Sequence, residues 1–218
     1  AHLAAQYQND PLGMRVYTSQ LLGQSKELVL HGGGNTSVKI DGILYVKGSG
    51  WNLDTIEKAG FSPVNLDVLL EMATRESLSD TQMVAEQRAA MSDQSFPNPS
   101  IEAILHAIIP YDYVDHTHAD AVVTLTNTPD GKALIQKLYG ENMLIVEYVM
   151  PGFELAKHIY ELTRNIEWDS LSGMILMHHG VFTFDNDAKR AYEKLIDLVT
   201  VAEEYLSEYV TLACGDCE

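Results

Sequence analysis

Cysteine is scarce in this chain, and both cysteines lie near the C-terminal end. Cys214 and Cys217 are the two among 218 residues, so the chain cannot carry a disulfide framework. One C-x-x-C pair also supplies only half of the ligands of a structural zinc ribbon. We interpret both cysteines as reduced thiols of a terminal tail. The lack of internal cysteine favours a reducing compartment, the cytoplasm.

Basic residues are few as well. The chain has 14 Lys and Arg against 31 Asp and Glu, a formal net charge of −17 at pH 7. An acidic surface repels phosphate backbones, and no run of basic residues is present, so nucleic acid and anionic membrane surfaces are excluded as partners. No apolar stretch reaches the length of a transmembrane helix. The sequence therefore predicts a protein that binds neither nucleic acid nor a membrane.

What is present is the composition of a packed chain, with 46% apolar and 21% charged residues. The length predicts one domain, residues 1–218. Helix and strand patterns alternate, and Asp41-Gly42 is typical of a hairpin, so we expect a layered α/β domain with a partly antiparallel sheet. Helices are expected over residues 10–25, 100–109, 132–139, 153–165 and 187–209. Strands are expected over residues 36–40, 43–47, 113–118 and 143–148, and over 173–177 with a continuation through 181–184. Residues 64–71 are either strand or short helix, and 77–99 a polar connection.

Histidines cluster at the ends of two of these strands. His116 and His118 stand two residues apart, and alternate residues of a strand project from the same face. His178-His-Gly180 follows a second apolar segment, 174–177. Two interpretations stay open at this point. The histidines could form a metal site with one coordination position left for substrate, or they could be ordinary surface or core histidines.

Glu102 lies where a helix is expected to begin. Ser100 is placed to cap that helix, with Glu102 in its first turn. The helix dipole favours an acidic residue there for purely local reasons. The alternative is a carboxylate that approaches a metal and transfers protons. Taken alone, the position favours the local role.

Two loops of small residues suit an anion. Gly32-Gly-Gly-Asn35 and Gly48-Ser-Gly50 offer bare main-chain amides to a group such as phosphate, and Ser100 could add a hydroxyl. Neither loop matches G-x-G-x-x-G or a Walker motif, so a nucleotide-binding fold is not indicated.

Together these segments resemble the class II aldolase/adducin family. They occur in the order typical of the family and extend over nearly the whole chain. The closest similarity is to the aldolase portion of bifunctional rhamnulose-1-phosphate aldolase/short-chain dehydrogenase proteins, on the basis of residues 31–37 and 46–51. The matching segments are Gly33-Gly-Asn-Thr-Ser37, Lys47-Gly-Ser-Gly50, Pro99-Ser-Ile-Glu102, His116-Thr-His-Ala119 and His178-His-Gly180.

The resemblance implies a fold, a site and an activity. The fold is a three-layer αβα sandwich around a mostly antiparallel sheet, assembled as a homotetramer. The activity is that of a cytoplasmic zinc-dependent lyase of carbohydrate metabolism, which cleaves a ketose 1-phosphate of the rhamnulose or fuculose type to dihydroxyacetone phosphate and an aldehyde. Zinc, or another divalent metal, is held by His116, His118 and His179. Glu102 is the catalytic acid/base and an occasional fourth metal ligand, and the phosphate is bound by Gly34, Asn35, Ser49, Gly50 and Ser100.

One difference from the fuculose-phosphate aldolases leaves alternatives open. Ile101 stands where those enzymes have a second serine before the glutamate, and neither Tyr205 nor Tyr209 can be matched to the tyrosines that they use. A dehydratase, decarboxylase or epimerase of the same fold, or a non-catalytic adducin-like interaction domain, therefore remains a rival.

Four residues close in sequence to the proposed site residues are not assigned to the site itself. We expect His106 to pack rather than face the site, and His178 to point away from His179 because strand residues alternate. Asp115 and Asp120 flank the His116–His118 segment, where either could orient an imidazole.

Overall fold

The fold is built on one seven-stranded sheet. The structure, a computed structural model, describes residues 4–214, with side chains through residue 209. The strand order is β3-β2-β1-β4-β7-β6-β5, and among these strands β5 and β6 pair in parallel while the other neighbours pair antiparallel. The strands are β1 Asn35–Ile40, β2 Ile43–Lys47, β3 Phe61–Asn65, β4 Tyr113–Thr117, β5 Met143–Val146, β6 Gly173–Leu176 and β7 Gly180–Asp185.

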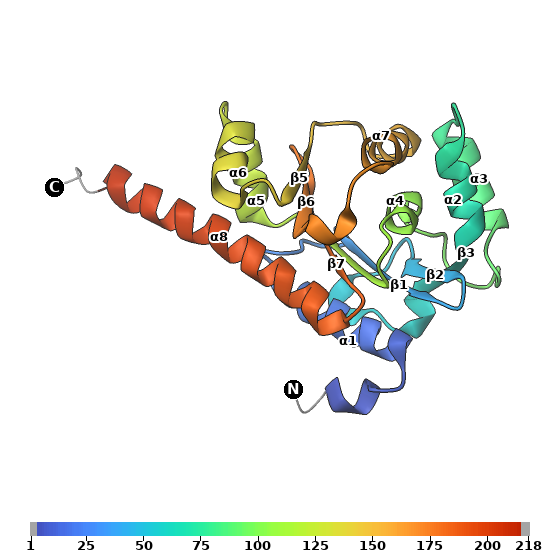
Figure 1. Ribbon diagram of the computed structural model, residues 1–218. Helices are drawn as coiled ribbons and strands as arrows, with labels where there is room; N and C mark the ends of the chain where they lie inside the picture. The colour runs from blue at the N-terminus through green and yellow to red at the C-terminus, as the bar shows by residue number, and fades with distance from the viewer. Residues whose placement is uncertain (1–3, 215–218) are drawn as a thin grey trace.

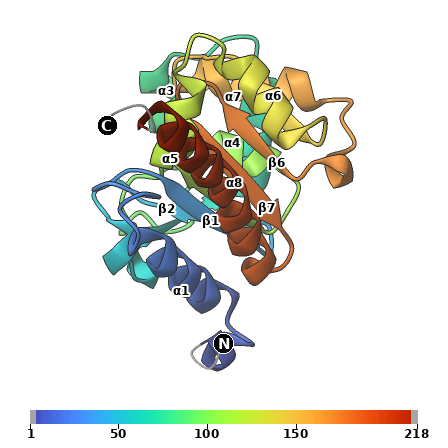
Figure 2. The same cartoon turned by 90° about the vertical axis from the view of Figure 1, so that its left-hand side faces the viewer.

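Helices cover both faces of this sheet (Figures 1 and 2). One helical layer consists of α1 Pro11–Gly23, α5 Asp120–Thr126, α6 Gly131–Tyr139 and α8 Ala188–Cys214. The other consists of α2 Leu66–Thr74, α3 Asp80–Ala89, α4 Ala103–Ile108 and α7 Phe153–Thr163. Apolar clusters fill the space on each side of the sheet. The three-layer α/β sandwich with a mostly antiparallel sheet is confirmed.

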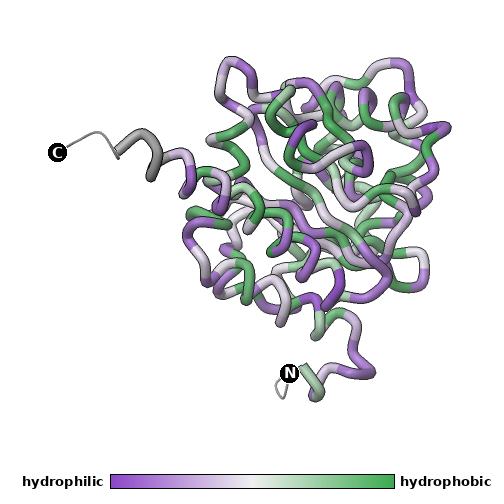
Figure 3. The backbone as a smooth tube through the Cα atoms, turned by 60° about the vertical axis from the view of Figure 1, so that its left-hand side comes forward, coloured by the Kyte–Doolittle hydropathy of each residue, from purple (hydrophilic) through white to green (hydrophobic). Residues whose placement is uncertain are grey.

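Short 3-10 helices and one long helix complete the chain. The 3-10 helices are η1 Ala4–Tyr7, η2 Leu53–Thr55, η3 Lys58–Gly60 and η4 Trp168–Ser170. The C-terminal part of α8 extends beyond the rest of the fold (Figures 1 and 3). Cys214 ends this helix, and Cys217 lies outside the described residues. None of the helices within residues 4–214 combines the length and the apolar character needed to cross a membrane.

Four sequence-based expectations about elements are corrected. Residues 173–184 form two strands, not one. The chain reverses in a tight turn that contains His178, whose φ is 59°. Strands β6 and β7 on either side of this turn pair antiparallel. Residues 64–71 divide between β3 and α2. Helix α3 lies in the expected polar connection and begins with a capping box of Ser79 and Gln82. Helix α5 was not expected at all, because its seven residues are too few for a helical period to emerge.

An ion pair lies fully buried under the centre of the sheet. Arg15 of α1 places Nη2 2.5 Å from Oδ1 of Asp115 in β4, and both side chains are fully buried. Arg15 also donates to the main-chain carbonyls of Ser37 and Val114, at 3.3 and 3.4 Å. Burial raises the pKa of the Asp115 carboxyl, and the charge of Arg15 opposes that rise. The hypothesis that Asp115 orients an imidazole is therefore wrong: its side chain projects to the α1 face of the sheet.

Removing one partner of this pair should destabilise the fold severely. In Arg15→Met the Asp115 carboxylate would lose its buried counter-charge, and we expect the free energy of unfolding to fall by about 3–5 kcal/mol. Urea denaturation followed by circular dichroism measures this change. Lys58→Met is the matched control, because the Lys58–Asp10 pair is solvent-exposed and should contribute about 0–1 kcal/mol. Equal losses in the two variants would contradict the assignment.

Candidate metal centre

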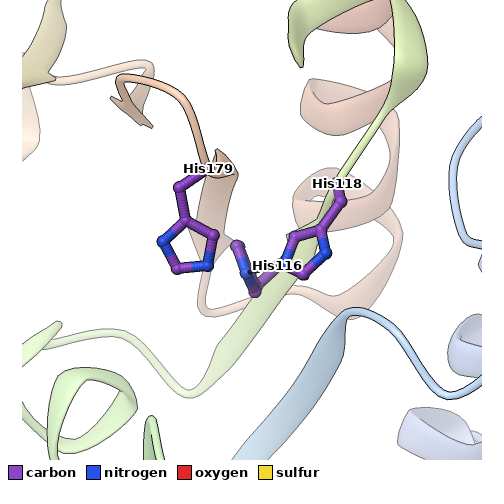
Figure 4. A group of neighbouring side chains, drawn as sticks. All are labelled: His116, His118 and His179. Carbon is purple, nitrogen blue, oxygen red and sulfur yellow. Dashed lines mark hydrogen bonds between the residues drawn. The ribbon is translucent and has the colours of Figure 1, made fainter. Parts of the chain in front are cut away.

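Three histidines converge at one end of the central strands β4 and β7 (Figure 4). His116 lies in β4, His118 directly follows that strand, and His179 lies in the turn between β6 and β7. One ring nitrogen from each histidine falls within 4.8 Å of the others, and the Nε2 atoms of His116 and His118 are 3.0 Å apart. Two nitrogens that bind one tetrahedral zinc ion lie about 3.3 Å apart. The predicted histidine trio is therefore brought together at a spacing that suits a metal ion.

The protonation of these rings also suits a metal. Nδ1 of His116 lies 3.0 Å from the Val181 carbonyl, which can only accept, so Nδ1 carries the proton and Nε2 presents a lone pair. Burial lowers the pKa of His116 well below its usual value and also lowers the pKa values of His118 and His179. Neutral imidazole is the form that binds metal.

The sheet register determines where His116 lies. Asn35 of β1 is directly opposite His116 on one side, and Phe182 of β7 is directly opposite on the other. Directly opposed residues of antiparallel strands share a face of the sheet, and the Phe182 ring stacks on the imidazole of His116 with 4.0 Å between centroids. His116 is thereby held between a polar neighbour and an aromatic one.

His178 lies in the same turn as His179, but its side chain does not belong to the cluster. Its side chain is exposed, and its Nδ1 lies 2.9 Å from Oδ1 of Asn127. The prediction that His178 is not a ligand agrees with the cluster, but the reason given for it was wrong. Strand alternation does not apply, because both His178 and His179 lie between β6 and β7.

Glu102 faces the histidines from the other side of the site. It is the N-cap residue of α4, one position before the helix that we expected it to enter. Its Oε2 lies 3.5 Å from Nε2 of His116, and its Oε1 lies 3.5 Å from Nε2 of His179. Asn35 donates from Nδ2 to Oε2 at 2.7 Å. The local interpretation of Glu102 therefore does not describe its surroundings.

One carboxylate oxygen of Glu102 is left without a partner. Oε1 is buried and accepts no hydrogen bond within the described part of the chain, and the same holds for Nδ1 of His179. Burial raises the pKa of the Glu102 carboxyl, while His179 and the hydrogen bond from Asn35 oppose that rise. A buried acceptor without a partner is costly. A cation among three neutral imidazoles would satisfy Oε1, so the donor set fits a divalent metal.

The two glycine loops lie beside this cluster. Gly34 has a φ of 64°, and a Cβ there would meet the His116 carbonyl at 2.8 Å, so the first loop lies tightly against β4. Lys47 donates from Nζ to the Gly32 carbonyl at 3.1 Å and thereby links the first loop to the second.

The second loop is joined in turn to the segment before Glu102. Ser49 donates its main-chain N–H to the Asn98 carbonyl at 2.8 Å, and Ser100 donates to the Lys47 carbonyl at 3.0 Å. Ser49 and Gly50 are exposed. The Ser100 hydroxyl accepts from the Glu102 N–H at 3.2 Å. Because Glu102 is the N-cap of α4, Ser100 lies two residues before the N-cap and does not cap the helix itself. Four of the five predicted anion-binding residues thus lie on loops that are joined to one another and to the site, and the fifth, Asn35, begins β1.

Two buried polar residues near the site, His106 and Ser37, were given no role there from the sequence. His106 is fully buried, which confirms that it packs, but it also forms hydrogen bonds with Ser37 and Asn35. The available signals were its position four residues after Glu102, on the same helix face, and the position of Ser37 two residues after Asn35, on the same strand face. Asp120, by contrast, is exposed at the start of α5.

These features define a three-layer α/β protein with a cluster of three histidines and a carboxylate that could hold a metal ion, and comparison with known proteins names the class. The family model described as Class II Aldolase and Adducin N-terminal domain matches residues 15–206. The chain belongs to this family.

Individual relatives agree with that assignment. The N-terminal class II aldolase domain of a conserved Thermoplasma acidophilum protein is 38% identical with a TM-score of 0.81, and the alignment covers 88% of this chain and 92% of that one. The L-fuculose-1-phosphate aldolase of Thermus thermophilus shares the fold, at 16% identity and a TM-score of 0.62, covering 93% and 96%.

A curated relative is much longer than this chain. The uncharacterized oxidoreductase YuxG of Bacillus subtilis (strain 168) is 35% identical over 204 residues, which is 89% of this chain but 29% of that protein. The chain thus spans about three tenths of the length of this relative.

Gly180 should be required for the metal centre. A Cβ at this position would clash with the Thr117 carbonyl and would lie 3.0 Å from ring atoms of His116 and His118. We therefore expect Gly180→Ala to displace both imidazoles and, if the cluster holds a divalent metal, to weaken its binding by about 10- to 100-fold, as measured by chelator competition with zinc as the probe. Gly32→Ala is the control, since its Cβ would make only an ordinary contact at 3.8 Å. Unchanged zinc affinity in Gly180→Ala would contradict this role.

Proposed function

We propose that the chain is a zinc-dependent lyase that catalyses the reversible aldol cleavage of a ketose 1-phosphate to dihydroxyacetone phosphate and an aldehyde. The observation that carries the proposal is the buried Glu102 carboxylate, whose unpartnered Oε1 faces the three neutral imidazoles. Membership of the class II aldolase and adducin family supports the same chemistry.

His116, His118 and His179 would hold the cation, with Glu102 as a fourth ligand when no substrate is bound. Three imidazoles suit zinc, although other divalent ions accept the same donors. A divalent cation at this place supplies electrostatic stabilisation of the negative charge that develops on substrate oxygens when the C3–C4 bond breaks.

Glu102 would move the proton. Its hydrogen bond from Asn35 occupies Oε2 and leaves Oε1 free. Burial raises the pKa of the carboxyl, and a raised pKa makes the group a better proton acceptor during turnover. Glu102 would take the proton of the C4 hydroxyl as the C3–C4 bond breaks and the aldehyde forms, and would then deliver this proton to the enediolate carbon. In the condensation direction it would remove a proton from that carbon and return it to the aldehyde oxygen.

The substrate phosphate would bind the joined loops. Gly34, Ser49, Gly50 and Ser100 offer amides and hydroxyls there, and Asn35 retains one Nδ2 proton beyond the one given to Glu102. Lys47 lies among these loops. Because the chain carries a net charge of −17, attraction of a phosphate would depend on these local donors and on the metal.

The finer assignment is an aldolase of the rhamnulose- or fuculose-1-phosphate type. The L-fuculose-1-phosphate aldolase fold supports the second possibility. The first possibility rests on the resemblance of residues 31–37 and 46–51 to bifunctional aldolase/dehydrogenase proteins, and similarity to a much longer protein named as an oxidoreductase is compatible with it. We further propose that residues 1–218 are one domain, that the chain assembles as a homotetramer, and that it acts in the cytoplasm.

A same-fold dehydratase, decarboxylase or epimerase is the second candidate. Ile101 favours it, because this side chain is 40% exposed beside Ser100 and adds apolar surface where a second phosphate-binding hydroxyl would otherwise stand. A non-catalytic adducin-like interaction domain is disfavoured, because such a domain has no need of three converging histidines and a buried carboxylate.

The substrate class can be tested directly. Zinc content of the purified protein should be measured together with cleavage of a panel of ketose 1-phosphates and their unphosphorylated ketoses. We expect one zinc ion per chain and release of dihydroxyacetone phosphate from at least one phosphorylated substrate. Turnover of only unphosphorylated compounds would favour the second candidate. If the purified protein binds no divalent ion, the interpretation as a non-catalytic interaction domain would be favoured instead.

Glu102→Gln should separate chemistry from folding. The amide keeps the size of the carboxylate but cannot accept a proton, so we expect a loss of about 10²- to 10⁴-fold in kcat with the fold and bound zinc retained. Steady-state kinetics of aldol cleavage and metal analysis provide the measurements. Glu161→Gln is the control, because Glu161 is exposed on α7. Turnover within a few-fold of the unmodified protein would show that Glu102 is not the acid/base.

A further inference from the structure

One face of β1 holds α4 in place through polar side chains. Lys39, at the far end of the strand, donates from Nζ to the carbonyls of Ile109 and Tyr111, at 2.7 and 2.6 Å, just beyond the end of α4. Ser37 and Asn35, two and four residues earlier on the same face, reach His106 on that helix. The contacts extend along the whole helix and end at Glu102, its N-cap.

A continuous hydrogen-bonded chain runs through His106. The Ser37 hydroxyl lies 2.7 Å from Nδ1 of His106, Nε2 of His106 contacts Oδ1 of Asn35, and Nδ2 of Asn35 donates to Oε2 of Glu102 at 2.7 Å. All four side chains are buried.

The positions of the protons in this series of hydrogen bonds follow from the groups it joins, beginning with Glu102. An ionised Glu102 can only accept, so Asn35 must present its NH₂ group to Glu102 and its carbonyl oxygen to His106. Nε2 of His106 is then the donor, and Nδ1 accepts from the Ser37 hydroxyl. Burial lowers the pKa of His106 well below its usual value, so the ring is neutral and has one nitrogen of each kind.

We propose that His106 is a positioning residue for the acid/base Glu102, acting through Asn35. The two ends of a carboxamide are nearly equal in shape, so the Asn35 amide has no steric preference for either orientation. The Nε2–H of His106 selects the orientation that gives Glu102 a donor on Oε2 and leaves Oε1 free for proton transfer. The opposite orientation would set two acceptors against each other. This inference rests on the proposed function of Glu102.

A purely structural role for His106 makes the opposite prediction. The ring lies edge-on to Phe182, with 5.5 Å between centroids, so apolar packing alone would be served as well or better by phenylalanine. A glutamine, in contrast, can place its amide NH₂ near the Nε2 position, whereas asparagine reaches only the Nδ1 position beside Ser37. Substitutions at position 106 therefore distinguish the donor to Asn35 from simple volume.

The test compares His106→Gln, His106→Asn and His106→Phe in aldol cleavage, with zinc content measured for each. We expect His106→Asn and His106→Phe to lose about 10- to 100-fold in kcat with KM and zinc content little changed. His106→Gln should stay within about 3-fold of the unmodified protein. The control is His158→Gln, an exposed histidine of α7, which should have no effect. If phenylalanine supports turnover as well as glutamine, or if the losses fall on KM or zinc content instead, the proposal is overturned.

A second measurement does not depend on turnover. In protein labelled with ¹⁵N-histidine, long-range ¹H–¹⁵N spectra at pH 7.5 report the tautomer of each ring, and the signals that disappear in His106→Gln identify His106. We expect the Nε2–H tautomer, and the Nδ1–H tautomer would overturn the inference even in an active enzyme. If the unmodified protein cleaves no ketose 1-phosphate, the proposed function fails, and the tautomer still decides whether His106 orients Asn35.

Discussion

The register of three antiparallel strands is the constraint on which the site depends. Strands β1, β4 and β7 place Asn35, His116 and Phe182 in a single row across the sheet, on one face. A shift of one residue in any of these pairings would move side chains to the opposite face. The hydrogen bond from His116 to the Val181 carbonyl, which determines the ligand tautomer, comes from the same strand pairing.

Both faces of the central strands bury polar groups. The sheet separates the two sets of polar groups, and the site depends on this separation. On the α1 side lie the Arg15–Asp115 ion pair and the Thr36–Ser19 hydroxyl contact. On the α4 side lie Asn35, Ser37, His106 and Glu102. Buried polar groups destabilise a fold unless they are paired, and satisfied networks hold side chains in one arrangement. Within the described residues, Oδ2 of Asp115 and Oγ1 of Thr117 also lack a hydrogen-bond partner. Oε1 of Glu102 differs from them because it lies 3.5 Å from the ring of His179, where the proposed chemistry requires an oxygen without a partner.

The acidity of the chain and its proposed anionic substrate are compatible for a physical reason. A net charge of −17 acts at long range and opposes extended polyanions, but salt screens it over roughly 10 Å. Inside the proposed site the relevant charges would be those of a bound cation and of oriented main-chain amides. Net charge therefore bears on association and solubility, and the local donor set decides which small anion can bind.

Local patterns were enough to predict much of the fold and most of the site. Three glycines, the Asp41-Gly42 turn and the H-x-H spacing are features of a few consecutive residues, and they predicted the β1–β2 hairpin, the loops and the ligand strand. Family resemblance added His179 and Glu102 to the same site, and the structure brings them together.

Long-range packing decided what the sequence could not. The reversal at His178 depends on β7 pairing back against β4, more than 60 residues earlier in the chain, so the local apolar pattern predicted one strand where there are two. Asp115 pairs with Arg15, one hundred residues away, and not with a neighbouring imidazole. Likewise, nothing near His106 shows that it meets Asn35 and Ser37, because that contact exists only once α4 lies across β1. The sequence by itself determined which chemical groups are available, and the tertiary structure decided which of them meet, because side-chain contacts between distant segments follow from strand register and helix placement rather than from local propensity.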